Sequence, residues 1–446
     1  MRSNYLRLAV AAALLAPGAM AFAEDASKEE SRPDTHGLPA GTDWKLDFSA
    51  GWGFFGFGNS LYANSHDEVT QDLSDNWMEG YVKGGFSGTH KMSGSGEFYG
   101  AISGVGERTY NAPPPAVGGE ASSFDVEDLY LGWRSGDMLG LGENALDFVV
   151  GRTQYKLGHG MLIYDGGSEG GSRGGFWSGA RKAFEFATIG RVKAGRTTIE
   201  AFYLDRDELP EADSASATYG ANFEFSWSED NTVGATWSSW TANGLRPERD
   251  GLEVINLRAY LTPIPSLKPL SFELEYAKED NGDALDSSAW NALVAWQLET
   301  AWKPKISYRY AVFEGDDPNT EENEAFDGLW TGFYDWGAWW QGEIAGEYFA
   351  SNSNLVSSQL RVHAKPNDAI GTGLILYDFT LENTASAGTT SDNLATELDW
   401  YMDWSLNDNF IVSVVAAYAH PGQAVEQAFD RDEDFYYGMV YVSYTY

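Results

Sequence analysis

Residues 394–406, LATELDWYMDWSL, carry apolar or aromatic side chains at alternate positions, with mostly acidic or small side chains between them. The apolar positions are Leu394, Leu398, Trp400, Met402, Trp404 and Leu406. The acids Glu397, Asp399 and Asp403 share the opposite face. Because successive side chains of a β-strand point to opposite faces, this pattern is typical of a strand with one apolar and one acidic face.

The same alternation recurs in residues 218–227, 271–276, 305–312 and 356–365. Clusters of Gly, Asn, Asp, Pro or Ser divide the chain into roughly 18 or 19 strands of ~10 residues, the length that a tilted strand needs to cross a bilayer. Short turns, such as residues 405–409, alternate with longer polar loops, such as residues 278–286, 314–328 and 423–434. This arrangement predicts an all-β fold, a transmembrane antiparallel β-barrel of about 18 strands.

A soluble exported all-β binding protein is an alternative, because a β-sandwich alternates in the same way with its apolar face inward. Aromatic residues near the strand ends favour the barrel, since amphipathic rings suit the boundary between headgroups and hydrocarbon. Examples are Trp237, Trp240, Trp290, Trp296, Trp400 and Trp404.

The last twelve residues, FYYGMVYVSYTY (435–446), contain no charge. One face would meet lipid, and it consists of Tyr436, Gly438, Val440, Val442, Tyr444 and Tyr446. The other face would line the lumen. A barrel tolerates no free edge, so this strand is expected to pair with the first one. Its terminal aromatic residue also resembles the signal by which barrel assembly machinery recognises its substrates.

The N-terminus has the pattern of a secretory signal peptide. Arg2 and Arg7 precede a short apolar run, and Ala21-Phe22-Ala23 provides the cleavage site. We therefore expect a signal peptide at residues 1–23, a periplasmic N-terminal segment at residues 24–42, and the barrel at residues 43–446 of a protein in the outer membrane of a Gram-negative cell.

Composition excludes several classes of function. With 29 Lys and Arg against 66 Asp and Glu, the net charge is −37, which repels nucleic acid. There is no cysteine, hence no thiolate chemistry. No metalloprotease motif or nucleophile elbow occurs, so we expect neither an enzyme nor a cofactor. Acidic external loops could bind Ca²⁺, although they lack the spacing of a calcium-binding loop.

Residues 152–206 reverse the sign of the charge, with nine basic and five acidic side chains. Alternation in residues 183–195 places Glu185, Arg191 and Lys193 on one face, so Arg191 and Lys193 are expected to point into the lumen. Arginine side chains around a constriction select anions through fixed positive charge and forked N–H donors.

Two segments resemble the alginate export family of outer-membrane porins. One comprises GRTQYKLGHGMLIYD (151–165) and GSRGGFWSGARKAFEFATIGRVKAGRTTIEAFYLDRD (171–207). The other runs from LDWYMDWSLNDNF (398–410) to the end of the chain. The resemblance implies a monomeric barrel of about eighteen strands, with a ring of basic side chains for an acidic polysaccharide.

These arguments predict passive transport of anionic solutes or an acidic polysaccharide through a pore in outer-membrane lipid. The expected pore-lining residues are Arg152, Arg173, Arg181, Glu185, Arg191, Lys193, Arg206, Arg309 and Arg361. Alternatively, these cations pair with luminal acids and only neutralise the interior, which would suit a general or cation-preferring diffusion porin. The glycine-rich residues 158–179 are either a gating loop inside the lumen or a flexible external loop.

Overall fold

A computed structural model describes residues 41–59, 75–111, 120–138, 140–264 and 269–446. The expected signal peptide, and the expected N-terminal segment apart from its last two residues, lie outside this part of the chain. The first strand begins at Thr42.

Eighteen antiparallel strands form one sheet. They are β1 (Thr42–Gly58), β2 (Asp75–Met92), β3 (Gly96–Tyr110), β4 (Ala121–Arg134), β5 (Leu146–Arg152), β6 (Phe186–Ala194), β7 (Thr197–Asp205), β8 (Ala217–Ser228) and β9 (Asn231–Thr241). The second half comprises β10 (Glu253–Leu261), β11 (Leu270–Asp280), β12 (Asp286–Gln297), β13 (Lys305–Phe313), β14 (Leu355–Asn367), β15 (Ile370–Thr380), β16 (Asn393–Ser405), β17 (Phe410–Pro421) and β18 (Phe435–Thr445). The number of strands confirms the prediction of about 18.

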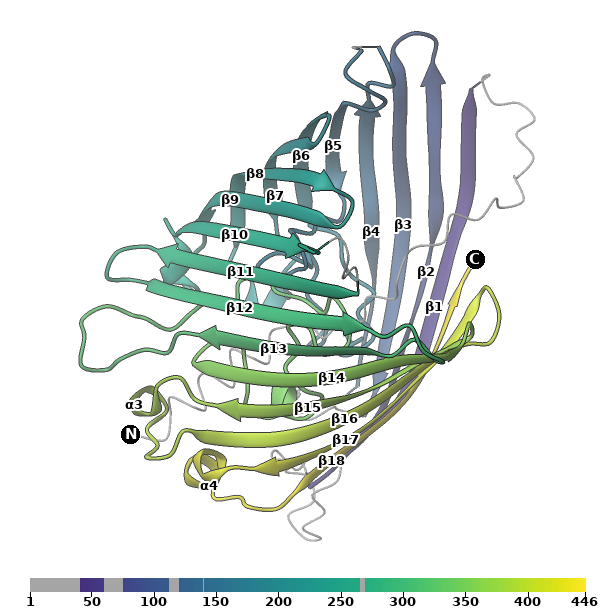
Figure 1. The fold of residues 1–446 in the computed structure, drawn as a ribbon. Coiled ribbons are helices and arrows are strands. Elements are labelled where there is room, and N and C mark those ends of the chain that lie inside the picture. The colour runs from purple at the N-terminus through teal and green to yellow at the C-terminus, as the bar shows by residue number, and fades with distance from the viewer. Residues whose placement is uncertain (1–40, 60–74, 112–119, 139, 265–268) are drawn as a thin grey trace.

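The sheet closes on itself because β1 pairs with both β2 and β18. The closing register joins Ser49 to Thr445 and Gly58 to Tyr436. In Figure 1 the strands follow one another around the wall, until the yellow end of the chain meets the purple β1. Closure leaves no free sheet edge along this seam, as a strand in hydrocarbon requires.

The alternation of side chains separates an outer apolar face from an inner one. On β18, Tyr436 and Val440 on the outer face are 50% and 45% exposed, whereas Tyr437 and Tyr441 on the inner face are 5% and 0% exposed. The same outer position is taken by apolar residues on β8, β11, β13, β14 and β16. A soluble β-sandwich would bury this apolar face, so the closed barrel rejects that alternative.

Hairpins differ in length between the two ends of the barrel. At one end, β6 and β7 are separated by only Gly195 and Arg196, and Gly195 adopts a φ of +59°, which a tight turn requires. At the other end, residues 153–185 join β5 to β6 and residues 314–354 join β13 to β14. We call these two connections the first and second luminal loops.

Both luminal loops fold into the barrel. The first crosses the lumen from β5: the backbone N–H of His159 donates to the Tyr260 hydroxyl of β10 at 3.1 Å, and Trp177 packs 5.4 Å from Tyr441 of β18. For the glycine-rich segment, this confirms the luminal location and rejects a flexible external loop. The prediction that residues 314–328 form an external polar loop is wrong in part, because Phe326 is buried and the connection continues inward to residue 354.

The helices are single turns or little more. They are η2 (Pro210–Ala212), η3 (Pro247–Arg249), α2 (Ala345–Tyr348), α3 (Thr384–Ala387) and α4 (Gln423–Phe429). Among the described residues, no helix has the length and apolar character that a transmembrane helix needs.

Candidate functional site

Buried glutamates of the wall hold the first luminal loop in place. Glu79 on β2 accepts the backbone N–H groups of Trp177 and Ser178, the latter at 2.6 Å. Glu127 on β4 accepts those of Lys182 and Ala183 at 2.8 and 3.0 Å. Hydrogen bonds to a charged acceptor are stronger than neutral ones, and a buried N–H without a partner is costly. The loop is therefore attached firmly at two strands.

The second luminal loop is attached in the same way and joined to the first. Glu397 on β16 accepts the N–H groups of Ile344 and Ala345 at 2.8 and 2.7 Å. Trp330 exchanges backbone hydrogen bonds with the first loop, donating to Leu162 at 2.9 Å and accepting from Tyr164 at 2.8 Å. The two loops consequently form one packed body inside the lumen.

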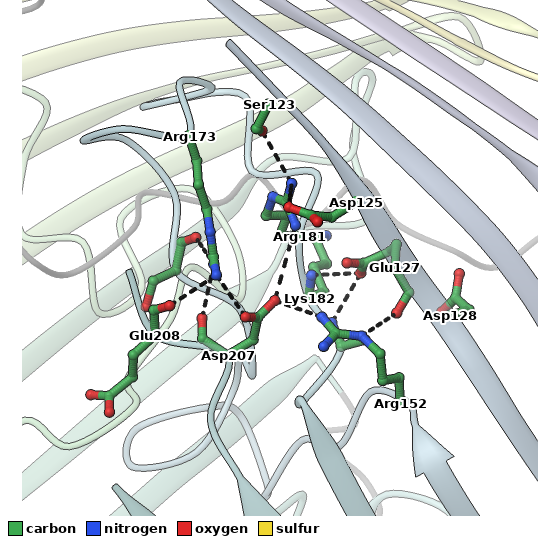
Figure 2. Close-up of polar contacts among 12 residues, drawn as sticks. Ser123, Asp125, Glu127, Asp128, Arg152, Arg173, Arg181, Lys182, Asp207 and Glu208 are labelled. Carbon is green, nitrogen blue, oxygen red and sulfur yellow. Dashed lines mark hydrogen bonds and ion pairs between the residues drawn. The ribbon is translucent and has the colours of Figure 1, made fainter. Parts of the chain in front are cut away.

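Three predicted pore residues converge on one carboxylate. Asp207 lies just after β7 and contacts Arg152 at 2.5 Å, Arg173 at 2.7 Å and Arg181 at 4.0 Å. Figure 2 shows the three guanidinium groups around it. Arg181 is fully buried and also contacts Glu107, at 2.7 Å. These arginines are thus largely neutralised by acids, which is the alternative that the sequence left open.

Arg191 and Lys193 occupy the inner side of β6, where the sequence placed them. Arg191 contacts Glu200 at 2.6 Å and Asp147 at 3.6 Å, and it is partly exposed. Lys193 is exposed near the short-turn end. Glu185 is also exposed, immediately before β6, and is separate from the arginine cluster.

Arg206 lies half-buried just after β7. Burial, together with the positive charge of Arg249, lowers the pKa of its guanidinium to about 10. Its Nε atom has no hydrogen-bond partner within the described part of the chain. Arg206 is therefore a half-buried cation that does not join the contacts to Asp207.

Arg309 and Arg361 lie on adjacent strands, β13 and β14, away from the Asp207 cluster. Arg309 is buried, donates to the carbonyl of Gly337 at 3.3 Å and lies 4.8 Å from the centre of the Trp339 ring. Arg361 binds both carboxylate oxygens of Asp335, at 2.5 and 3.2 Å. These two arginines mainly hold the second luminal loop.

Arg134 and Lys156, which are not among the predicted pore-lining residues, face a cavity inside the barrel. A cavity of about 240 Å³ is lined by inner-face residues of β3 to β6 and by the start of the first luminal loop. Its charged residues are Arg134, Asp147, Lys156 and Arg191. Lys156 is exposed, and its Nζ lies 4.8 and 5.8 Å from the ring centres of Tyr334 and Tyr164.

A local signal for Lys156 existed in the sequence. Thr153, Tyr155 and Leu157 are buried while Gln154 and Lys156 are exposed, so the period of two continues beyond the end of β5. Burial, followed by the charge of Lys182, lowers the pKa of Lys156. No carboxylate contacts Lys156 among the ion pairs of the described residues, which distinguishes it from the paired arginines.

Metal ligands do not gather at this site. The described ranges contain no group of three or more His, Asp or Glu side chains arranged to hold a metal ion. Calcium binding by the acidic external loops stays a prediction.

Comparison with solved structures shows the same barrel in outer-membrane proteins. OccK5 (OpdH) of Pseudomonas aeruginosa shares 13% identity, with a TM-score of 0.56, over 90% of this chain and 98% of that chain. OpdQ of the same organism shares 12%, with a TM-score of 0.58, over 90% and 97%. OccAB4 of Acinetobacter baumannii shares 9%, with a TM-score of 0.55, over 90% and 98%. At these identities the likeness concerns the fold.

The sequence itself carries the family signal. No curated protein matches the chain. The model of the alginate export family matches residues 106–438, about three quarters of the chain. The match includes the whole first segment that suggested the resemblance, and the second segment as far as residue 438. That match identifies a channel of the outer membrane and not an enzyme. The chain belongs to the alginate export family of outer-membrane porins.

Proposed function

We propose that this porin passes anionic solutes passively and that Lys156 attracts them into the narrow part of the lumen. The supporting observation is the cavity beside the first luminal loop, where Lys156, Arg134 and Arg191 face the same space. Small carboxylates and the acidic saccharides associated with the family are the solutes that such a lining would favour.

The arginines contribute less to this selectivity than their number suggests. Asp147 lies 3.5 Å from Arg134 and 3.6 Å from Arg191, so one acid offsets part of both charges. Lys156 contacts tyrosine rings instead, and no carboxylate among the ion pairs of the described residues offsets its charge. We assign it the largest single contribution to anion selectivity.

A cation-preferring porin is the second candidate. The net charge of −37 and the pairing of most luminal arginines favour it. Acidic side chains at the mouth of the pore would then determine the electric field that an entering ion experiences. The two candidates predict opposite signs of the reversal potential across a KCl gradient.

The test is the reversal potential of purified protein in a planar bilayer. We expect Cl⁻ to permeate better than K⁺, and we expect Lys156→Gln to lower the Cl⁻/K⁺ permeability ratio about fivefold, the factor for loss of ~1 kcal/mol of attraction. The control is Lys303→Gln, because Lys303 is exposed in the turn between β12 and β13. A wild-type preference for K⁺ would refute anion transport, and an unchanged ratio in Lys156→Gln would refute the role of Lys156.

We also propose that the barrel is a monomer inserted by barrel assembly machinery. The closed sheet supports this, since β1 and β18 satisfy each other and need no strand from another chain. Light scattering of the detergent-solubilised protein, corrected for bound detergent, should give the mass of one chain.

A further inference from the structure

Five carboxyl groups are buried between the second luminal loop and the wall. Glu343 and Glu347 belong to the loop, Glu397 and Asp399 to β16, and Glu79 to β2. None is more than 7% exposed. We call these five residues the acidic niche.

The niche lies where the loop docks. Besides the two N–H groups that Glu397 accepts, Asp399 accepts the N–H of Glu343 at 3.3 Å. The second carboxylate oxygen of Asp399 is buried and has no hydrogen-bond partner within the described residues. The docked loop therefore covers acidic side chains that only backbone N–H groups contact.

Protons are expected on Glu343 and Glu347 in the docked loop. Burial, followed by the negative charge of Asp399, raises the pKa of Glu343 well above its ordinary value. Burial, followed by the charges of Glu343 and Glu79, raises the pKa of Glu347 well above its own. Within the described chain, the charges acting on these two groups are all carboxylates, and one oxygen of Glu347 has no hydrogen-bond partner. Burying two such charges without a cation is far costlier than keeping the groups protonated.

The other groups that face the niche are tyrosines. Tyr437 of β18 and Tyr377 of β15 lie near the carboxyl groups, and neither supplies a positive charge. Apolar contacts complete the docking, since the Tyr348 ring lies 4.8 Å from Phe57 and 5.8 Å from Phe435. Protonation of the niche is thus the part of the docking that solvent pH can change.

We propose that the acidic niche is a proton-dependent latch, which holds residues 341–350 against the wall at neutral pH and releases them into the lumen at alkaline pH. The niche is built on β16 and β2, whereas the open cavity is lined by β3 to β6. A docked loop leaves that cavity free, and a released loop interrupts the current. The latch is a gate in addition to the proposed selectivity, whichever ion the pore prefers.

The direction in which pH changes the docking of the loop follows from proton linkage. The docked state binds more protons than the released state, so raising the pH favours release. For each carboxyl group that is protonated when docked and ionised when released, the ratio of docked to released loop falls tenfold per pH unit. The ratio of docked to released loop begins to fall above the ordinary glutamate pKa of about 4.3 and stops falling above the raised pKa values of the docked carboxyl groups. With Glu343 and Glu347 both involved, it reaches about a hundredfold per pH unit.

Chemical modification of a single cysteine tests the release directly. The chain has no cysteine, so Ala345→Cys, buried in α2, introduces a unique thiol. The reference is Glu321→Cys, exposed on the external part of the same loop, which corrects for the effect of pH on thiol reactivity. We expect the ratio of methanethiosulfonate modification rates, Ala345→Cys over Glu321→Cys, to rise at least tenfold between pH 7 and pH 9. Adding Glu343→Gln and Glu347→Gln, which mimic the protonated groups, should abolish the rise.

Single-channel recording tests the latch without a cysteine. The open fraction of the wild-type pore should fall between pH 7 and pH 9, whereas the Glu343→Gln/Glu347→Gln pore should stay open. A constant ratio of modification rates, or a rise that persists in the glutamine background, would overturn the proposal. An open fraction that does not change with pH, or that changes equally in both proteins, would also overturn it. None of these outcomes depends on whether the pore prefers anions.

Discussion

Replacing Asp207 with Asn is expected to lower the free energy of unfolding by about 3 kcal/mol, because three arginines lose the carboxylate they share. The substitution keeps the shape of the side chain and one oxygen acceptor. It also leaves the backbone contacts of residue 207 in place, including its N–H donation to Gly166 at 2.7 Å. The change therefore isolates the charge.

The magnitude follows from how little water reaches the cluster. The side chains of Arg152, Arg173 and Arg181 are 18%, 11% and 1% exposed. Removing one partner of a buried ion pair costs about 3–5 kcal/mol, since a buried charge is left uncompensated. Arg181 keeps Glu107, and the new amide oxygen still accepts one hydrogen bond, so the lower end of the range applies.

Urea unfolding in detergent micelles, followed by tryptophan fluorescence, measures the loss. The matched control is Asp213→Asn in the same connection. Among the described residues, its exposed carboxylate accepts only a local N–H, from Ala215 at 2.8 Å. That variant should lose less than about 1 kcal/mol. If Asp207→Asn also loses less than this, the three arginines are compensated elsewhere and the cluster in Figure 2 does not stabilise the loop.

Two further predictions concern the second luminal loop. Burial raises the pKa of the Asp335 carboxyl, but the guanidinium of Arg361 outweighs it and lowers that pKa. The wild type should therefore be more stable than Asp335→Asn above about pH 4, and this advantage should disappear as the pH falls through the lowered pKa. Unfolding curves recorded from pH 7 to pH 2 measure the difference. An advantage that is constant over this range would show that the pair does not form. Trp330 is fully buried, and its ring centre lies 4.4 Å from that of Trp240 and 5.3 Å from that of Phe184. Trp330→Ala should therefore lower the free energy of unfolding by about 3–5 kcal/mol in the urea assay described above. A decrease below about 1 kcal/mol would mean that the two loops do not pack there.

The wall of the barrel could be predicted from sequence because two solvents act on every strand. Lipid on one side and the lumen on the other impose a period of two, and a shift by one residue would reverse both faces. Residues 397–404 show this directly: Leu398, Trp400 and Trp404 are exposed on the outer face, whereas Glu397, Asp399 and Tyr401 are buried on the inner face.

The loops could not be predicted in the same way. Residues 329–340, LWTGFYDWGAWW, are as aromatic as a membrane-facing strand end, yet they pack inside the lumen. Aromatic rings suit the membrane interface and a packed interior equally well, and composition does not distinguish the two. The partners of the arginines could not be predicted from sequence either, because Asp207 is 55 positions along the chain from Arg152 and Glu107 is 74 positions from Arg181.

Some luminal acids have a role that the sequence did not suggest. Alternation alone makes them counter-charges to the arginines, but Glu79, Glu127 and Glu397 hold the backbone of the two luminal loops. An acid that is buried under a loop is held away from a hydrated ion in the open lumen, and the Coulomb interaction between them falls with distance. Under the proposed function, the total of −37 is a poor guide to ion selectivity in this barrel. What an ion meets in the cavity is the short set of Arg134, Asp147, Lys156 and Arg191, in which the cations outnumber the acid.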